Sequence, residues 1–354
     1  MGRTTLVWLL LAGLTAACVW EESSALRGPD AATKTRDTQE SITGRSDGVA
    51  SAQAFPQRPV RLIEPFGAGG GPDITARALA RELSKLWHQP VDVENRPGSG
   101  ATLAPALVSK APADGYTLLV NTSAQAYSAG LGMRPGYDPL KDFVPVAPLT
   151  SQPYVFVTGR KTGFRTVHDL IAAAKERHVK ITFGSTGEGV GSHIGAAEMS
   201  LAAGLNATHI PPLPDDAIAD VIAHTIAGRT DYFLAPIPTA LPAIRRGDLI
   251  ALGVSTIKQS RLIPDVPTIA ESGIAGFDFP IWYGVWAPAG TPSDVVAKIS
   301  ADITRALASA ELRGWMDEHG ADPMAMTQRE FTLFVERESE RAKRVVRAGG
   351  TVPP

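Results

Sequence analysis

Short runs rich in β-branched and aromatic residues alternate with longer segments of helical periodicity from Arg58 onward. Repeated strand–helix alternation is typical of parallel sheets with helices on both faces. The pattern runs once before Pro153 and resumes after it. The sequence therefore predicts an α/β protein with two lobes.

The alternation assigns each expected element a residue range. The expected strands are 60–65, 91–94, 116–121, 154–158, 181–184, 209–211, 231–234, 249–255 and 282–287. The expected helices are 72–87, 102–111, 167–177, 192–203, 217–227, 239–246, 293–308 and 329–347. Two of the strand-to-helix loops are rich in glycine, and these are the strongest functional signals in the chain.

The first glycine-rich loop spans residues 66–73. Consecutive glycines let backbone N–H groups approach a ligand closely, and a helix N-terminus favours an anion. Asp73 is expected in the first helical turn, where a carboxylate complements the helix dipole; the alternative is a tight turn with Asp73 only as a cap. The candidate binding residues are Phe66, Gly67, Ala68, Gly69, Gly70, Gly71 and Asp73.

The second glycine-rich loop, residues 184–193, also follows a strand and opens a helix. Its hydroxyl groups add donors, although Ser192 could instead be a helix N-cap and His193 a hydrogen-bonded structural residue. Open α/β sheets bind ligands outside the carboxyl ends of their strands, so two such loops fit a cleft gripped from both sides. The candidate binding residues are Ser185, Thr186, Gly187, Ser192 and His193.

Enzyme and nucleic-acid signatures are missing from the sequence. Neither loop fits the dinucleotide or phosphate-loop pattern, and no histidine spacing suits zinc. A secreted hydrolase using Ser192 or Ser185 with His193 remains an alternative, against which the missing nucleophile-elbow spacing argues. With 34 basic and 36 acidic residues and no basic run, the chain is not expected to bind nucleic acid.

The N-terminal 18 residues predict export. A basic start at Arg3, a short apolar core and small residues before Cys18 form a secretory signal peptide. Cys18 is the only cysteine, which excludes an internal disulfide. It is a candidate for lipidation, and ordinary cleavage nearby is the alternative. Residues 19–54 are expected to form a disordered tether.

Besides the first loop and Asp73, several ordered motifs stand at residues 59–66, 93–100, 114–119, 137–143, 262–268 and 287–292. Together they resemble the motifs of the substrate receptors of tripartite tricarboxylate transporters, also called Bug-type receptors. The resemblance runs from about Phe55 to Gly349. The chain departs from the family pattern at residues 212–216 and at Ala235–Pro236, so no ligand contact is carried over there.

The resemblance implies a two-lobed type II periplasmic-binding-protein fold with a ligand cleft between the lobes, no catalysis and no cofactor. It adds Asn121, Thr122 and Ser123 to the expected cleft. The expected lobes are residues 55–151 with 281–354, and residues 152–280. We expect a periplasmic monomer that carries a small organic acid to membrane transporter subunits; an orphan receptor serving a sensor kinase is the alternative.

Overall fold

A computed structural model of the chain describes residues 55–98, 101–131, 136–177, 180–211 and 218–349. The predicted signal peptide (1–18) and tether (19–54) lie outside the described residues, as does the departing segment 212–216. Among the residues that are described, no helix is long and apolar enough to cross a membrane.

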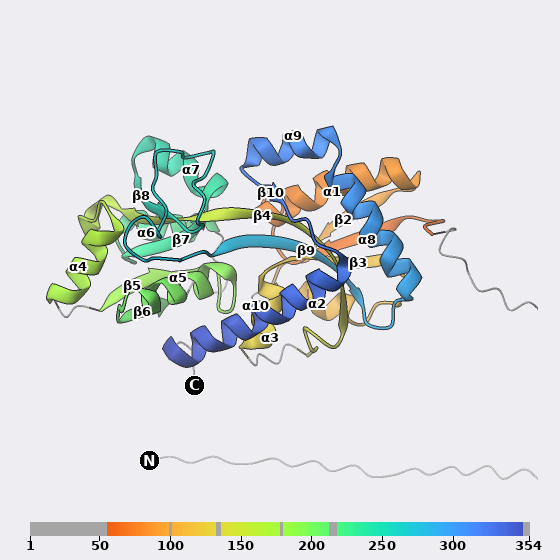
Figure 1. Cartoon of the computed structure of the whole chain (residues 1–354), viewed down its shortest axis with the longest axis horizontal. Coiled ribbons are helices and arrows are strands. Elements are labelled where there is room, and N and C mark those ends of the chain that lie inside the picture. The colour runs from red at the N-terminus through yellow and green to blue at the C-terminus, as the bar shows by residue number, and fades with distance from the viewer. Residues whose placement is uncertain (1–54, 99–100, 132–135, 178–179, 212–217, 350–354) are drawn as a thin grey trace, which may run out of the picture. The chain divides into compact units, whose positions relative to one another are not determined.

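The strands follow the order β2-β1-β3-β9-β4-β7-β5-β6, with β8 and β10 paired to β4 (Figure 1). Their bounds are β1 Val60–Glu64, β2 Val91–Asn95, β3 Thr117–Thr122, β4 Phe143–Gly159, β5 Ile181–Gly184, β6 Ala207–Ile210, β7 Tyr232–Pro236, β8 Leu249–Val254, β9 Pro280–Pro288 and β10 Asp322–Pro323. Every strand expected from the sequence is present, and all except β4 lie within a few residues of their expected bounds.

The helices are also close to expectation. Their bounds are α1 Gly71–Trp87, α2 Leu103–Val108, α3 Ala124–Gly130, η3 Arg160–Thr162, α4 Val167–Arg177, α5 Gly191–Ala202, α6 Ile218–Ala227, α7 Ile237–Arg246, α8 Ser293–Leu307, α9 Ala310–His319 and α10 Gln328–Gly349. Helices α3 and α9 were not expected, and α2 is shorter than its predicted range 102–111.

Strand β4 begins at Phe143, well before the expected start at residue 154. The sequence predicted no element at residues 143–153, whose prolines cannot donate to the ladder. The structure accommodates them at irregularities, since the register of β4 with β9 shifts between Pro145 and Ala147 and again between Pro148 and Ser151.

The parallel strand pairs expected from the alternation are present, and the structure adds antiparallel pairs to them. β1 pairs in parallel with β2 and β3, and β5 with β6 and β7. Every antiparallel pair involves β4 or β9. These two strands therefore turn two parallel sets into a mixed arrangement.

Strands β4 and β9 run side by side along the molecule (Figure 1). The residues of β4 up to Pro153 pair with β9, and those from Tyr154 onward pair with β7 and β8. In Figure 1, α4 to α7 gather around one end of these strands, and α1, α8 and α9 around the other. The lobe boundaries predicted from the sequence stay a proposal, which this change of partners supports.

Candidate functional site

The first glycine-rich loop presents an open backbone to solvent. Helix α1 has Gly70 as its N-cap with no side-chain capping bond, and Pro72 lies in its first turn. A Cβ added at Gly67 or Gly69 would meet nothing within 4 Å. Since a helix leaves its first N–H groups without intrahelical acceptors, the start of α1 can receive an anion.

Asp73 lies in the first turn of α1 as predicted, but its carboxylate is engaged inside the protein. One oxygen accepts the Gly69 N–H at 2.8 Å. The other accepts from the Asn95 amide at 2.9 Å and from Arg77 at 2.9 Å. Asp73 is 3% exposed. Its carboxylate therefore stabilises the conformation of the loop.

The second loop opens α5 in the same way. Val190 is the N-cap without a side-chain capping bond, so the alternative of Ser192 as the cap was wrong. Instead, the Ser192 hydroxyl accepts the Thr186 N–H at 3.1 Å. The Ser185 hydroxyl accepts the Gly187 N–H at 3.2 Å and lies 2.7 Å from His209 Nε2.

His193 lies buried beneath this loop against His209, with ring centroids 4.3 Å apart. Its Nδ1 accepts the Gly189 N–H at 3.2 Å, which leaves the proton on Nε2. That Nε2 has no partner among the described residues. Burial lowers the pKa of His193 to about 4, and burial together with the neighbouring His193 lowers the pKa of His209 to about 3. Both rings are therefore neutral at physiological pH.

The hydrolase hypothesis requires a serine bonded to His193. His193 Nδ1 accepts the Gly189 N–H and Nε2 has no partner among the described residues, so neither Ser185 nor Ser192 is bonded to this ring. Ser185 contacts His209 instead, a partner that the sequence analysis did not anticipate because strand β6 offers no motif around it. The serine–histidine pairing of that hypothesis is not formed.

The end of β3 meets the start of α5. Asn121 donates to Gln125 at 3.0 Å and accepts the Thr122 N–H at 2.8 Å, while the Thr122 hydroxyl accepts the Ala124 N–H at 3.1 Å. The Ser123 hydroxyl is buried and has no partner among the described residues. A Cβ at Gly191 would lie 3.2 Å from it, so Ser123 adjoins the second loop.

A small cavity of about 10 Å³, roughly the room for one water, joins these segments. One side is formed by the end of β3, α3 and the start of α2, and the other by residues 188–190 of the second loop. Its lining residues are Ala101, Thr102, Asn121, Ala124, Gln125, Ser128, Tyr137, Glu188, Gly189 and Val190. The structure thus brings Asn121 and the second loop together, while the lining includes no residue of the first loop.

Each of the two helix starts lies against a tyrosine of a crossing strand. A Cβ at Gly71 would lie 2.5 Å from the Tyr283 hydroxyl of β9, and a Cβ at Gly191 would clash with the Tyr154 hydroxyl of β4. The sequence analysis missed both tyrosines, because neither stands in a recognisable motif. Glycine at these positions lets the backbone approach the crossing strands. Pro236 of β7, one of the departures from the family pattern, is paired with Tyr154 of β4.

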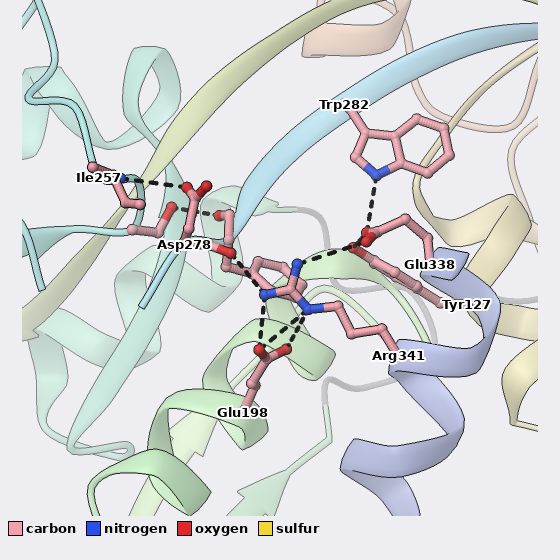
Figure 2. A network of polar contacts seen from close by, with 9 residues as sticks. Tyr127, Glu198, Ile257, Asp278, Trp282, Glu338 and Arg341 are labelled. Atoms are coloured by element: carbon pink, nitrogen blue, oxygen red, sulfur yellow. Dashed lines mark hydrogen bonds and ion pairs between the residues drawn. The ribbon is translucent and has the colours of Figure 1, made fainter. Parts of the chain in front are cut away.

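Helix α10 connects the elements that carry the site (Figure 2). Arg341 of α10 donates to both oxygens of Glu198 on α5, at 2.8 and 2.7 Å, and to the Asp278 carbonyl at 2.7 Å. Tyr127 of α3 donates to Glu338 at 2.9 Å. One helix therefore fixes α3, which follows Asn121–Ser123, relative to α5, which carries the second loop.

Among the described residues, no group of three or more His, Cys, Asp or Glu side chains could hold a metal ion. The geometry offers backbone N–H groups, hydroxyls and a neutral imidazole donor. These groups suit the oxygen atoms of an anionic ligand.

The sequence of the chain is similar to that of known proteins. The family model described as the tripartite tricarboxylate transporter family receptor matches residues 75–351. Protein BugT of Bordetella pertussis is 33% identical over 303 residues, which are 85% of this chain and 92% of BugT.

Solved structures agree with that match. R. palustris Rpa4515 with adipate has a TM-score of 0.76 at 30% identity, covering 85% of this chain and 100% of that one. The periplasmic binding protein BugD has a TM-score of 0.73 at 28% identity, covering 84% and 99%. MatC from Rhodopseudomonas palustris with bound malate has a TM-score of 0.72 at 30% identity, covering 82% and 100%. The two-lobed fold is shared with these proteins.

Proposed function

The chain belongs to the tripartite tricarboxylate transporter receptor family, and on that premise we propose that it captures a small carboxylate-bearing molecule outside the cytoplasmic membrane and delivers it to a transporter of that type. The family consists of periplasmic solute-binding receptors and not of enzymes. We further propose that Cys18 anchors the exported protein through a lipid, which loss of membrane association in Cys18→Ser would support.

The observation that carries this proposal is the pair of glycine-rich loops that open α1 and α5 without side-chain caps. Each helix start offers unpaired N–H groups and the positive end of a helix dipole. A carboxylate can therefore bind at either start with no arginine, and a ligand with two carboxylates could use both.

Two buried groups of the proposed site also favour a ligand. Ser123 Oγ and His193 Nε2 have no partner among the described residues. A buried polar group without a hydrogen bond costs about 1–3 kcal/mol. A ligand that accepts from each of these groups would remove that cost, so Ser123, at the end of β3, and His193, in the second loop, are the side-chain contacts that we propose.

The ligand class follows from the donors and from the relatives. The sites at α1 and α5 supply donors and no cation, which suits a small acid rather than a highly charged one. Rpa4515 is solved with adipate and MatC with malate. We therefore propose a small aliphatic mono- or dicarboxylic acid for this chain.

A thermal-shift screen of such acids, with malate and adipate included, tests the function. A ligand at a hundredfold excess over its Kd stabilises the folded state by roughly 2.7 kcal/mol. The matching diamides are the controls, because they keep the shape and lose the charge. Stabilisation by an acid and not by its diamide is expected; no stabilisation by any acid would contradict the proposal.

A further inference from the structure

Glu64 is a buried carboxylate next to the proposed site that the proposal above does not use. It is the last residue of β1, directly before the first glycine-rich loop, and it is 0% exposed. Among the described residues, no cation forms a salt bridge with Glu64, and Arg77 pairs with Asp73 instead. Burying an ionised carboxylate without a counter-ion costs free energy, so the protonation state of Glu64 affects the energy of the loop.

The contacts of Glu64 tie it to the loop. One of its oxygens accepts the Phe66 N–H at 2.9 Å. The other accepts from the Asn95 amide, which also donates to Asp73 at 2.9 Å. Because Asp73 in turn accepts the Gly69 N–H at 2.8 Å, two carboxylates joined by one amide hold the loop at Phe66 and at Gly69.

The charged groups near Glu64 are mostly paired with one another. Helix α1 contributes the ion pair of Asp73 with Arg77, and β2 contributes Glu94 and the exposed Asp92, of which Glu94 is paired with Arg61 and Arg96. Strand β3 and residues 65–72 carry no charged side chain. Ionised Glu64 therefore adds one negative charge beneath the loop, to which no cation forms a salt bridge among the described residues, and neutral Glu64 adds none.

Burial raises the pKa of Glu64 to about 7, with the nearby Asp73 carboxylate acting in the same direction; the hydrogen bonds from Phe66 and Asn95 and the charge of Arg77 oppose the rise. Both forms are therefore populated near neutral pH. An anion bound at the loop disfavours the charged form further.

We propose that Glu64 is a proton-linked positioning residue of the first glycine-rich loop: in its neutral form it allows the loop to hold an anionic ligand, and in its ionised form it opposes binding. This inference rests on the proposed function. Linkage is reciprocal, so ligand binding takes up a proton by the same coupling.

The sign of the pH dependence follows directly. Below the Glu64 pKa the carboxyl group beneath the loop is neutral, and above that pKa its negative charge repels the carboxylate of the ligand. Affinity for a carboxylate therefore falls as pH rises through about 7. Allosteric couplings of this kind are typically on the order of fivefold or more.

Calorimetry with malate and adipate as probes tests the inference, because both acids stay ionised on each side of the transition. The wild-type chain and Glu64→Gln are titrated about one pH unit below and above the Glu64 pKa of about 7, in two buffers that differ in ionisation enthalpy. We expect the wild type to lose roughly fivefold in affinity and to take up a proton fraction on binding. Glu64→Gln should keep its affinity across both conditions and take up none.

Glu82→Gln is the matched control. Glu82 is also a poorly exposed carboxylate, on α1, but it pairs with Lys85 away from the loop. This variant should keep the wild-type pH profile. Glutamine preserves the shape of the Glu64 side chain and removes its charge. The dependence of affinity on pH therefore separates an effect of the Glu64 charge from a merely structural role.

The outcomes are distinguishable. Binding with parallel pH profiles in wild type and Glu64→Gln overturns the inference and leaves the proposed function standing. Failure of every acid in the screen to bind at either pH overturns the proposed function. If Glu64→Gln does not fold, the wild type decides alone, since binding without net proton uptake near the Glu64 pKa overturns the inference.

Discussion

Asp73 and Glu64 lie on either side of the Asn95 amide, yet their pKa values shift in opposite directions. Burial acts to raise the pKa of Asp73, but hydrogen bonds from Arg77, Gly69 and Asn95 outweigh it and hold that pKa below its usual value. For Glu64 burial prevails. The difference comes from the cation, because Arg77 contacts only Asp73 among the two carboxylates.

The raised pKa of Glu64 predicts a loss of stability with rising pH. The folded state holds its proton up to about 7, against an ordinary value of 4.5. Stability from this group is therefore fully present below about 4.5 and declines as pH rises through 7. The decline amounts to about 3 kcal/mol. Urea unfolding across this window should show it in the wild type, and a difference between wild type and Glu64→Gln that does not vary with pH would contradict it.

Gly67→Val should weaken ligand binding without unfolding the protein. A Cβ at Gly67 meets no protein atom within 4 Å, so the new side chain projects into the space proposed for the ligand. A lost hydrogen bond to a charged group costs about 1.5–3 kcal/mol, roughly ten- to hundredfold in Kd.

The matched control is Gly314→Val, since Gly314 on α9 also meets nothing within 4 Å and lies outside the proposed site. Titration with the best acid of the screen measures both variants. Equal affinities for Gly67→Val and Gly314→Val would exclude the first loop as an anion site.

At the scale of elements, the start of α1 is fitted to strand β9. We expect Gly71→Ala to destabilise the fold by about 1–3 kcal/mol, because its Cβ would lie 2.5 Å from the Tyr283 hydroxyl. Tyr283→Phe removes that oxygen and should restore most of the loss in the double variant. Its own cost, the loss of the 2.8 Å hydrogen bond from Gln152, is measured in the single variant. Additive losses in the double variant would show that the clash is not the cause.

The contact of α10 with α5 gives a second prediction at this scale. Glu198→Gln removes the carboxylate that receives Arg341, whose side chain is 21% exposed, so a loss of about 2 kcal/mol in unfolding free energy is expected. Glu340→Gln is the control on α10, the helix that carries Arg341, because Glu340 is 60% exposed and pairs with Lys343 one turn away. Its effect should stay within about 0.5 kcal/mol. Equal effects in chemical denaturation would contradict a special role for the Arg341–Glu198 pair.

For the whole molecule, the two-lobed fold predicts that a ligand brings the lobes together. The cavity between the end of β3 and the second loop, about 10 Å³, is too small for an organic acid of several carbons. Entry of the ligand therefore requires an open form, which binding then disfavours. Small-angle scattering should show a smaller radius of gyration with the bound acid than without it, and an unchanged radius would contradict closure.

The order of strands and helices and the two glycine-rich loops were predictable from the sequence, because local periodicity and backbone freedom are properties of neighbouring residues. The part of β4 before residue 154 and the short helix α3 were not predicted, since pairing with β9 and contact with α10 involve segments distant in the sequence.

Contacts between distant segments were beyond the sequence. Nothing local to Asn95 indicates that its amide joins Glu64 to Asp73, and nothing near Ser185 indicates His209. Burial and charge pairing depend on which segments the fold brings together. The sequence therefore determined the family, the class of fold and the loops that open the two helices, whereas only the tertiary structure decided which carboxylate is paired and which is left to titrate.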